Sequence, residues 1–460
     1  MSATYFIALA VIAVANYVYG SKRARAFQST GLRGSLHSLP VYHGWYMAAA
    51  SALPMFLLFT VWMTLAPRWI EQRTLQQLPQ AMQSADPLAR ATVLREISNA
   101  TAGGALAEGA SAEIKQAASS MQSLNELSGW ALLGAGLGLA GLGFLWGSSQ
   151  LRPDFRARNT VERIVTSALV ACSVVAVLTT VGIVFSVLFE SLRFFGKYPW
   201  NEFLFGLQWS PQTAMRADQI GQSGTFGFVP LFVGTMLIML IAMLVAVPIG
   251  LFAAIYMAEY ATPRFRATAK PVLEILAGVP TVVYGFFAAL TVAPVIRAAG
   301  TYFGLDVASE SALAAGLVMG VMIIPFVSSL SDDVINAVPQ TLRDGSYAMG
   351  ATKSETIKKV VLPAALPGIV SAIMLAVSRA IGETMIVVMA AGLAGNLTFN
   401  PLESVTTITV QIKTLLVGDQ EFDSAKTLSA FALGFALFFF TLILNMAALK
   451  IVQKYREQYD

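Results

Sequence analysis

The chain has 460 residues, of which 56% are hydrophobic and 12% are charged, and its formal net charge is +4. Soluble domains carry about 25% charged residues, so this composition excludes an ordinary soluble protein and favours a polytopic membrane protein. The small net charge does not indicate a nucleic-acid partner. One cysteine excludes a disulfide framework, and two histidines in one loop, His37 and His43, disfavour a histidine metal centre.

Nine apolar stretches are long enough to cross a bilayer, which requires about 20 mostly apolar residues. They lie at about 3–20, 45–66, 129–148, 164–189, 228–256, 272–296, 311–330, 366–395 and 427–449. The alternative for residues 1–20 is a cleaved signal peptide, but the basic residues follow the apolar run, which favours a retained anchor. We therefore predict an all-α polytopic membrane protein with about nine transmembrane helices.

Lysine and arginine residues indicate the orientation of these spans. They gather in loops 21–44, 149–163, 257–271 and 331–365, and in the tail after residue 449. With nine spans all five segments lie on one side of the membrane, and short basic segments lie in the cytoplasm. We therefore expect the N-terminus outside the cytoplasm and the C-terminus inside it.

The chain divides near residue 150. Residues 1–150 hold three spans and an outside segment, 67–128, which is rich in Ala, Gln, Ser and Glu and is typical of soluble helices. This insert is either a solvated addition or a docking surface for an extracytoplasmic partner. Residues 151–460 hold six spans with both ends inside.

The cytoplasmic loop 331–365 is long and predicts one or two short helices between Pro339 and Pro363. A short amphipathic helix here is either a lipid-surface element or a knob that fits a soluble partner. The sequence contains no G-x-x-x-x-G-K-[ST], G-x-S-x-G or H-E-x-x-H motif. Any energy for work across the membrane therefore comes from a partner or from a gradient.

The segment SRAIGETM, residues 378–385, places Arg379 and Glu383 four residues apart in an apolar span. Residues with this spacing share a helix face, so the two can pair. A charge near the bilayer midplane costs at least ~2.5–3.5 kcal/mol, and buried ion pairs often fail to offset their desolvation. The pair is therefore either a structural lock between spans or part of a polar pathway.

In a polar pathway, the Arg379 guanidinium would offer several donors to an oxyanion, and Glu383 would hold the arginine in place. Thr281, Tyr284 and Thr384 add hydroxyl groups that either donate to such an anion or only pack between helices. We treat these five residues as the candidate substrate pathway.

The stretch DGSYAMGATKSETIKKVVLP, residues 344–363, resembles the coupling loop of ABC importer permeases. Asp stands here for the Glu of that family, and Gly-Ser stands for Ala-Ala. In the family this loop forms a helix that sits in a cleft of the ATPase subunit. The resemblance therefore implies coupling to an ATPase, through Arg343, Asp344, Gly345, Ser346 and Gly350.

Three further stretches resemble phosphate importer permeases. They are LAGVPTVVYGFFA (276–288), IIPFVSSLSDDVINAVP (323–339) and SRAIGETM. The methionine after the threonine is similar to the PstC type of subunit rather than the PstA type. The resemblance covers about 155–460, leaves the first 150 residues as an addition to a six-span type I importer core, and associates Arg379 and Glu383 with the phosphate path.

The resemblance implies a non-catalytic permease subunit of an ATP-driven importer of inorganic phosphate in the bacterial inner membrane. It implies no metal or cofactor on this chain, and a separate ATP-binding subunit that uses ATP and Mg²⁺. The other implied partners are a PstA-type permease, a periplasmic phosphate-binding protein and membrane lipids, with no nucleic acid. The alternatives are an importer of phosphonate, molybdate or sulfate, or a gradient-driven transporter, which predicts inverted repeats and carboxylates in both halves.

Overall fold

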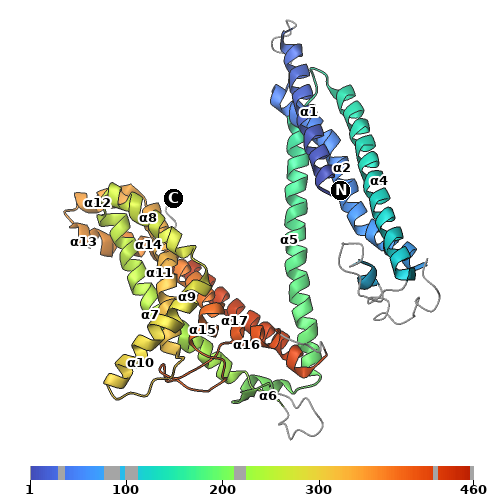
Figure 1. Cartoon of the computed structure of the whole chain (residues 1–460). Helices are drawn as coiled ribbons and strands as arrows, with labels where there is room; N and C mark the ends of the chain where they lie inside the picture. Colours follow the sequence, from blue (N-terminus) through green and yellow to red (C-terminus); the bar gives the residue numbers. More distant parts are fainter. Residues whose placement is uncertain are drawn as a thin grey trace. The chain divides into compact units, whose positions relative to one another are not determined.

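The computed structural model describes residues 2–29, 37–76, 94–98, 112–211, 224–417 and 423–455. The chain divides into two compact units, Met1–Leu178 and Thr179–Asp460. Within the described ranges nine helices are long and apolar enough to cross a membrane, and six of them begin at or after residue 157 (Figure 1). The predicted all-α polytopic fold is confirmed, while the predicted boundary near residue 150 stays a prediction.

Unit 1 consists of helices only in its described part. They are α1 (Ser2–Ser29), α2 (Pro40–Gln76), a short helix at 94–98, α4 (Ala112–Gln150) and the first part of α5 (Ala157–Phe195). Helix α2 packs against both α1 and α4. Glycine allows this close approach, because a Cβ atom on Gly143 of α4 would lie 2.1 Å from the Ala50 carbonyl oxygen.

The predicted outside insert, 67–128, lies partly within the long helices. Helix α2 continues to Gln76 and α4 begins at Ala112, so both helices extend beyond their apolar portions. The helix at 94–98 contributes Ile97 to a small buried cluster with residues from both neighbours, namely Leu75, Ile114, Ala117 and Ala118. Residues 77–93 and 99–111, which include the stretch NATAGGALAEG, lie outside the described residues.

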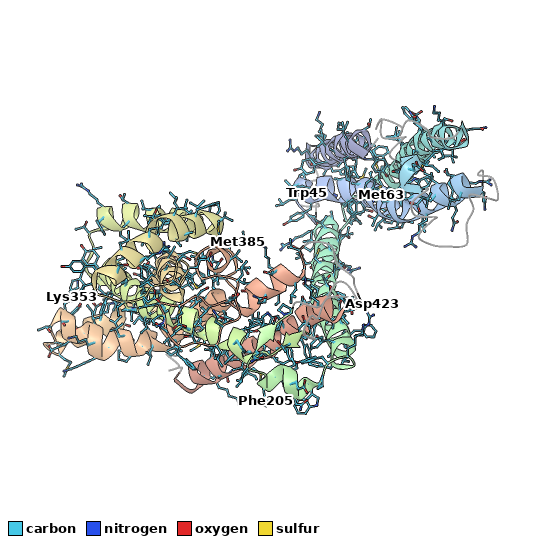
Figure 2. The ribbon with its side chains drawn as sticks, turned by 60° about the horizontal axis from the view of Figure 1, so that its bottom comes forward. Trp45, Met63, Phe205, Lys353, Met385 and Asp423 are labelled. Carbon is cyan, nitrogen blue, oxygen red and sulfur yellow. The ribbon has the colours of Figure 1, made fainter. Side chains whose placement is uncertain are left out.

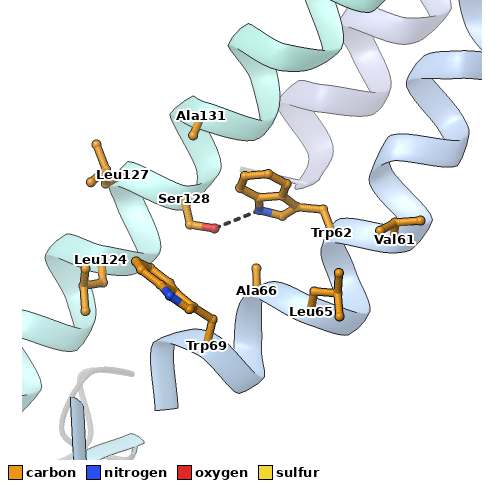
Figure 3. Close-up of a pocket in the computed structure, with 9 residues that line it drawn as sticks. All are labelled: Val61, Trp62, Leu65, Ala66, Trp69, Leu124, Leu127, Ser128 and Ala131. Carbon is orange, nitrogen blue, oxygen red and sulfur yellow. Dashed lines mark hydrogen bonds between the residues drawn. The ribbon is translucent and has the colours of Figure 1, made fainter. Parts of the chain in front are cut away.

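An apolar groove of about 420 Å³ lies between α2 and α4 (Figure 3). Ser128 is the one hydroxyl residue in its lining, and Trp62 Nε1 donates to Ser128 Oγ over 2.9 Å. The groove therefore offers an apolar surface, and Trp69 lies at its side, one residue after Arg68. Tryptophan beside a charged residue is typical of the boundary between acyl chains and water.

Unit 2 begins with the end of α5 and a small cap built around aromatic residues. The cap contains α6 (Trp200–Phe205) and the antiparallel strands β1 (Trp209–Ser210) and β2 (Thr225–Phe226), with Trp209 opposite Phe226. Phe194 and Phe203 are fully buried beside these strands, and their ring centroids lie 5.4 Å apart. The cap is therefore a second, aromatic core of this unit.

The remaining elements of unit 2 are helical and include three π-helical segments. They are α7 (Val229–Ile255), η1 (Tyr256–Tyr260), α8 (Pro263–Ala277), α9 (Thr281–Phe287), η2 (Ala288–Val292) and α10 (Ala293–Tyr302). They continue with α11 (Ala312–Ala337), α12 (Gln340–Ala348), α13 (Lys353–Thr356), η3 (Ile357–Val361) and α14 (Leu362–Ile381). The last are α15 (Met385–Ala390), α16 (Ile408–Leu415) and α17 (Ala425–Tyr455).

Helix α11 is the centre of unit 2. In its apolar window 61% of the residues are buried, against 33% or less in the other candidate spans. It packs mainly against α7, where a Cβ atom on Gly316 would lie 2.7 Å from Ile241. Met319 and Ile323 are buried in the main core on the same helix. The packing of α11 therefore fixes the position of Asp332 near its end and of α12, which follows it.

Two predicted spans differ from the structure. The predicted span 272–296 is divided, because α8 ends at Ala277 and α9 begins after Pro280, which has no N–H to continue a helix. Helix α8 has no buried residues and lies on the surface of the unit. The predicted span 366–395 is also divided, since α14 ends at Ile381 and a new helix begins at Met385.

Large apolar side chains project outward from helices of both units (Figure 2). Trp45 and Met63 on α2 are 56% and 53% exposed, and Phe205 on α6 is 71% exposed. Extensive exposed apolar surface marks a membrane or protein contact rather than a surface in water. The distribution of side chains thus agrees with the length of the helices in indicating a membrane protein.

Candidate functional site

One end of unit 2 carries a helical knob formed by α12, α13 and η3 (Figure 1). Helix α11 ends before Pro339, which then begins α12. Gly350 has a φ of +82°, a left-handed conformation that allows the chain to turn between α12 and α13. Thr352 and Glu355 form a capping box that starts α13. The predicted short helices between Pro339 and Pro363 are therefore confirmed.

Four of the five predicted coupling residues lie at or near the surface of this knob. Asp344, Gly345 and Gly350 are exposed. Ser346 is half-buried, and its Oγ atom lies 2.9 Å from Thr356 Oγ1, which ties α12 to α13. Met349, at the end of α12, is 89% exposed. The knob thus presents an exposed surface that a partner can contact.

Arg343, the fifth of these residues, is buried and does not lie on that surface. Its Nε and Nη2 atoms donate to Glu259 Oε1 over 3.1 and 3.0 Å. Its Nη1 atom donates to the Val338 carbonyl oxygen over 2.6 Å, and its Nη2 atom also donates to the Ile335 carbonyl oxygen over 2.8 Å. A direct contact between Arg343 and an ATPase, as the motif suggested, does not fit this position.

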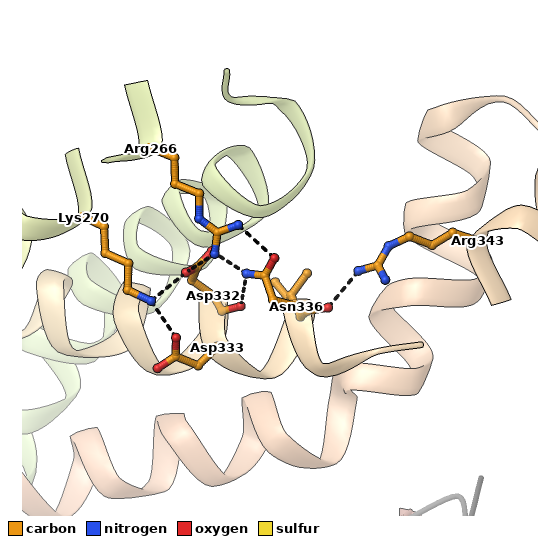
Figure 4. Close-up of polar contacts among 7 residues, drawn as sticks. Arg266, Lys270, Asp332, Asp333, Asn336 and Arg343 are labelled. Carbon is orange, nitrogen blue, oxygen red and sulfur yellow. Dashed lines mark hydrogen bonds and ion pairs between the residues drawn. The ribbon is translucent and has the colours of Figure 1, made fainter. Parts of the chain in front are cut away.

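Beside the knob, a cluster of charged residues attaches α8 to the end of α11 (Figure 4). Arg266 Nη2 lies 2.9 Å from Asp332 Oδ2, and Lys270 Nζ lies 3.1 Å from the same oxygen. Lys270 also donates to Asp333 Oδ1 over 2.6 Å, and this bond is the largest reason why the pKa of Lys270 is raised. Asn336 Nδ2 donates to Asp332 Oδ1 over 2.9 Å, so both oxygens of the fully buried Asp332 carboxylate have partners.

A polar hollow of about 510 Å³ lies between the knob and η1. Its charged lining residues are Glu259, Arg343 and Lys353. The Lys353 ammonium lies 4.8 Å from the centroid of the Tyr260 ring, a cation–π distance. The sequence motifs did not point to the pairing of Glu259 with Arg343 or of Asp332 with Arg266, because these partners lie 84 and 66 residues apart in the chain.

The second region of interest is the break between α14 and α15. Glu383 lies beyond the end of α14, and its Oε1 atom accepts hydrogen bonds from the N–H groups of Thr384, Met385 and Ile386 over 3.2, 3.0 and 3.5 Å. The Glu383 carboxylate therefore caps α15. The predicted pairing of Glu383 with Arg379 is wrong, because the helix that would place them on one face ends at Ile381.

Arg379 is exposed in the last turn of α14. Within the described part of the chain no carboxylate lies within 4.0 Å of it, and its guanidinium lies 6.0 Å from the centroid of the Phe326 ring. It follows Leu362 by 17 residues, which is about 26 Å along a helix. Arg379 is therefore a cation deep in an apolar segment, and among the described residues it has no anionic partner.

The three hydroxyl residues lie in two segments, Thr384 in this break and Thr281 and Tyr284 in α9. Helix α9 packs against α15, which brings the segment that begins at Thr281 beside the segment that begins after Thr384. Tyr284 Oη donates to the Leu276 carbonyl oxygen over 3.0 Å, so its proton is already used within the chain. Thr384 Oγ1 donates to the Gly382 carbonyl oxygen over 3.4 Å, and Thr281 is half-buried. The structure thus packs helix α9, which carries Thr281 and Tyr284, against α15, which follows Thr384.

A bundle of apolar spans with an exposed helical knob and an arginine inside an apolar segment is the arrangement expected of a permease driven by an external ATPase. Two family models agree with this class. Residues 6–179 match a model described as phosphate ATP-binding cassette transporter, and residues 246–457 match binding-protein-dependent transport system inner membrane component. The first match extends the similarity into the N-terminal part, which the sequence motifs had left outside.

Curated relatives support the same class. The chain is 33% identical over 273 residues to the probable ABC transporter permease protein YqgH of Bacillus subtilis, covering 58% of this chain and 83% of that protein. It is 34% identical over 248 residues to the phosphate transport system permease protein PstC 1 of Mycobacterium bovis, covering 50% of this chain and 73% of that protein. The chain therefore belongs to the binding-protein-dependent inner membrane components, and within them to the PstC-type phosphate transport system permeases.

Solved structures of ABC transporters are also similar to this chain. One is the MetNI methionine ABC transporter in inward-facing conformations, with 19% identity and a TM-score of 0.37, covering 50% of this chain and 95% of that chain. Another is a bacterial ABC transporter involved in the import of alginate, with 14% identity and a TM-score of 0.44, covering 65% and 100%.

Proposed function

We propose that this chain moves inorganic phosphate across the bacterial inner membrane, as one of two permease subunits of an ATP-driven importer. The observation that carries the proposal is the exposed Arg379 in an apolar segment, which has no carboxylate within 4.0 Å in the part of the chain that the structure describes. An intramembrane cation faces either water or an opposite charge, since a charge in lipid is costly. A guanidinium is suited to bind the oxygens of a phosphate anion through several hydrogen bonds.

The permease depends on partners for energy and delivery. A separate subunit that binds ATP and Mg²⁺ docks on the exposed knob around Asp344 and Met349, and this chain hydrolyses nothing. A PstA-type permease completes the pathway, because the six spans from residue 157 onward form half of such a pore. A periplasmic phosphate-binding protein delivers the anion. In this arrangement the N-terminus is periplasmic and the C-terminus is cytoplasmic.

The test is the uptake of labelled phosphate by cells that depend on this chain, for wild type and Arg379→Gln. A hydrogen bond to a charged group contributes about 1.5–3 kcal/mol, so we expect uptake to fall at least about tenfold while the protein remains in the membrane. The control is Arg297→Gln, since Arg297 is an exposed arginine of the same unit that donates to the Ser309 carbonyl oxygen over 3.2 Å.

Two results would contradict the proposal. Undiminished uptake by Arg379→Gln would remove Arg379 from the pathway. Strong competition by unlabelled sulfate, molybdate or phosphonate, with weak competition by phosphate, would assign the permease to another oxyanion.

A further inference from the structure

The hydrogen bonds of Arg343 form a compact unit that we call the α12 clamp, consisting of Arg343, Glu259 and the carbonyl groups of Ile335 and Val338. A guanidinium has five N–H groups, and Arg343 makes four hydrogen bonds, each of 3.1 Å or less. The side chains of Arg343 and Glu259 are 10% and 7% exposed. The clamp is therefore a buried contact and not a surface ion pair.

The clamp joins η1 to α11 and α12, which follow one another in the chain. Arg343 belongs to α12, Glu259 to η1, and the two carbonyl groups lie at the end of α11. The last carbonyl groups of a helix have no partner within it, so a cation at this position stabilises the helix end. The Arg343 side chain thus fixes α12 to the end of α11 and to η1, which continues α7.

A second contact follows the same route. Lys353, at the start of α13, lies over the ring of Tyr260, which is the neighbour of Glu259 in η1. Segment η1 directly continues α7, and α7 packs extensively against α11 in the main core. A displacement of the knob therefore reaches α7 and α11 together, through Arg343 and Lys353.

We infer that Arg343 is a positioning residue that transmits the movement of α12 to α7 and α11, and that it does not contact the ATPase. The inference rests on the proposed function, in which an ATPase moves α12. Lysine cannot replace Arg343 in this role, because a single ammonium group does not reach the Glu259 carboxylate and both carbonyl groups in the planar arrangement of a guanidinium.

The first test compares wild type, Arg343→Lys and the control Arg158→Lys in the complete transport complex reconstituted into liposomes. Arg158 is a suitable control because its side chain is 61% exposed and pairs with the exposed Glu162. For Arg343→Lys we expect ATP hydrolysis within about twofold of wild type, with at least a fivefold drop in phosphate transported per ATP. An unchanged ratio of phosphate to ATP would overturn the inference, whether both rates stay normal or fall together.

The second test measures the rigidity of the clamp without any transport. Nitroxide labels are placed at Thr341→Cys on α12 and Val321→Cys on α11, both exposed positions, in a Cys172→Ser background. We expect a narrow distance distribution in the complex with intact Arg343, both without nucleotide and with ATP, and a distribution at least twice as wide with Arg343→Lys. Equal widths would overturn the inference. The width of the distance distribution does not depend on the substrate. Equal widths would therefore refute the role of Arg343 without refuting phosphate transport, and a wider distribution would support that role even if the transported anion is not phosphate.

Discussion

The attachment of α8 depends on Asp332, and the change Asp332→Asn tests this dependence. Helix α8 has no buried residues of its own, so the cluster of charged residues replaces the apolar contacts that hold most helices. Asp332 is completely buried, while Arg266 and Lys270 are 32% and 27% exposed. Asparagine preserves the shape of the side chain but removes the charge, and it directs an NH₂ group toward one of the cations.

The expected loss of stability follows from these exposures. Removing one partner of a buried ion pair costs about 3–5 kcal/mol, and partial exposure of both cations reduces this to roughly 2–3 kcal/mol. In a domain of this size 1 kcal/mol shifts the midpoint of thermal unfolding by about 2–4 °C, so we expect a decrease of about 5–10 °C. Tryptophan fluorescence of the purified complex during heating measures the midpoint. Hydrogen exchange of the α8 amides, compared between the two proteins, shows where the structure loosens.

The neighbouring residue provides a matched control. Asp333 is 61% exposed and contacts Lys270 only at the surface, so Asp333→Asn should change the free energy of unfolding by no more than about 1 kcal/mol. If the two substitutions lower the midpoint equally, burial of Asp332 is not what holds α8. If Asp332→Asn leaves both the midpoint and the exchange of α8 unchanged, the cluster does not hold α8 at all.

Three further substitutions separate conformation from contact. Gly345→Ala should increase the free energy of unfolding by about 1 kcal/mol, because alanine favours a helix interior and the added Cβ atom meets no neighbour. Gly350→Ala should decrease the free energy of unfolding by about 1–2 kcal/mol because of the positive φ at this position. Shifts of the thermal midpoint in the same direction for both variants would contradict this reasoning. Tyr284→Phe should lower the free energy of unfolding by about 1 kcal/mol or less, because the Leu276 carbonyl group loses its donor, and should leave the KM of phosphate uptake unchanged. A raised KM at normal stability would instead place the Tyr284 hydroxyl group in the pathway.

Much of the fold could be predicted, because the length and hydropathy of a span are local properties of the sequence. The nine spans and the short helices of the knob follow from such patterns, although the span predicted at 272–296 is divided at Pro280. The interruption after Ile381 was missed, since no proline marks it and the segment stays apolar on both sides. The partners of Arg343 and Asp332 could not be predicted, because which distant carboxylate meets which cation depends on how α7, α8 and α11 pack.

The three π-helical segments have a consequence for how this protein responds to changes in chain length. A π turn contains one residue more than an α turn, and one residue rotates a helix by about 100°. Segment η3 lies between the knob and α14, on which Arg379 stands. Deleting a single residue between Ile357 and Val361 would therefore convert η3 to an α turn and leave the direction of Arg379 relative to the knob nearly unchanged, whereas a deletion in α14 before Arg379 would rotate the arginine by about 100°. The direction of the Arg379 side chain therefore depends on the number of residues in α14 before Arg379, and substitutions alone would not reveal this dependence.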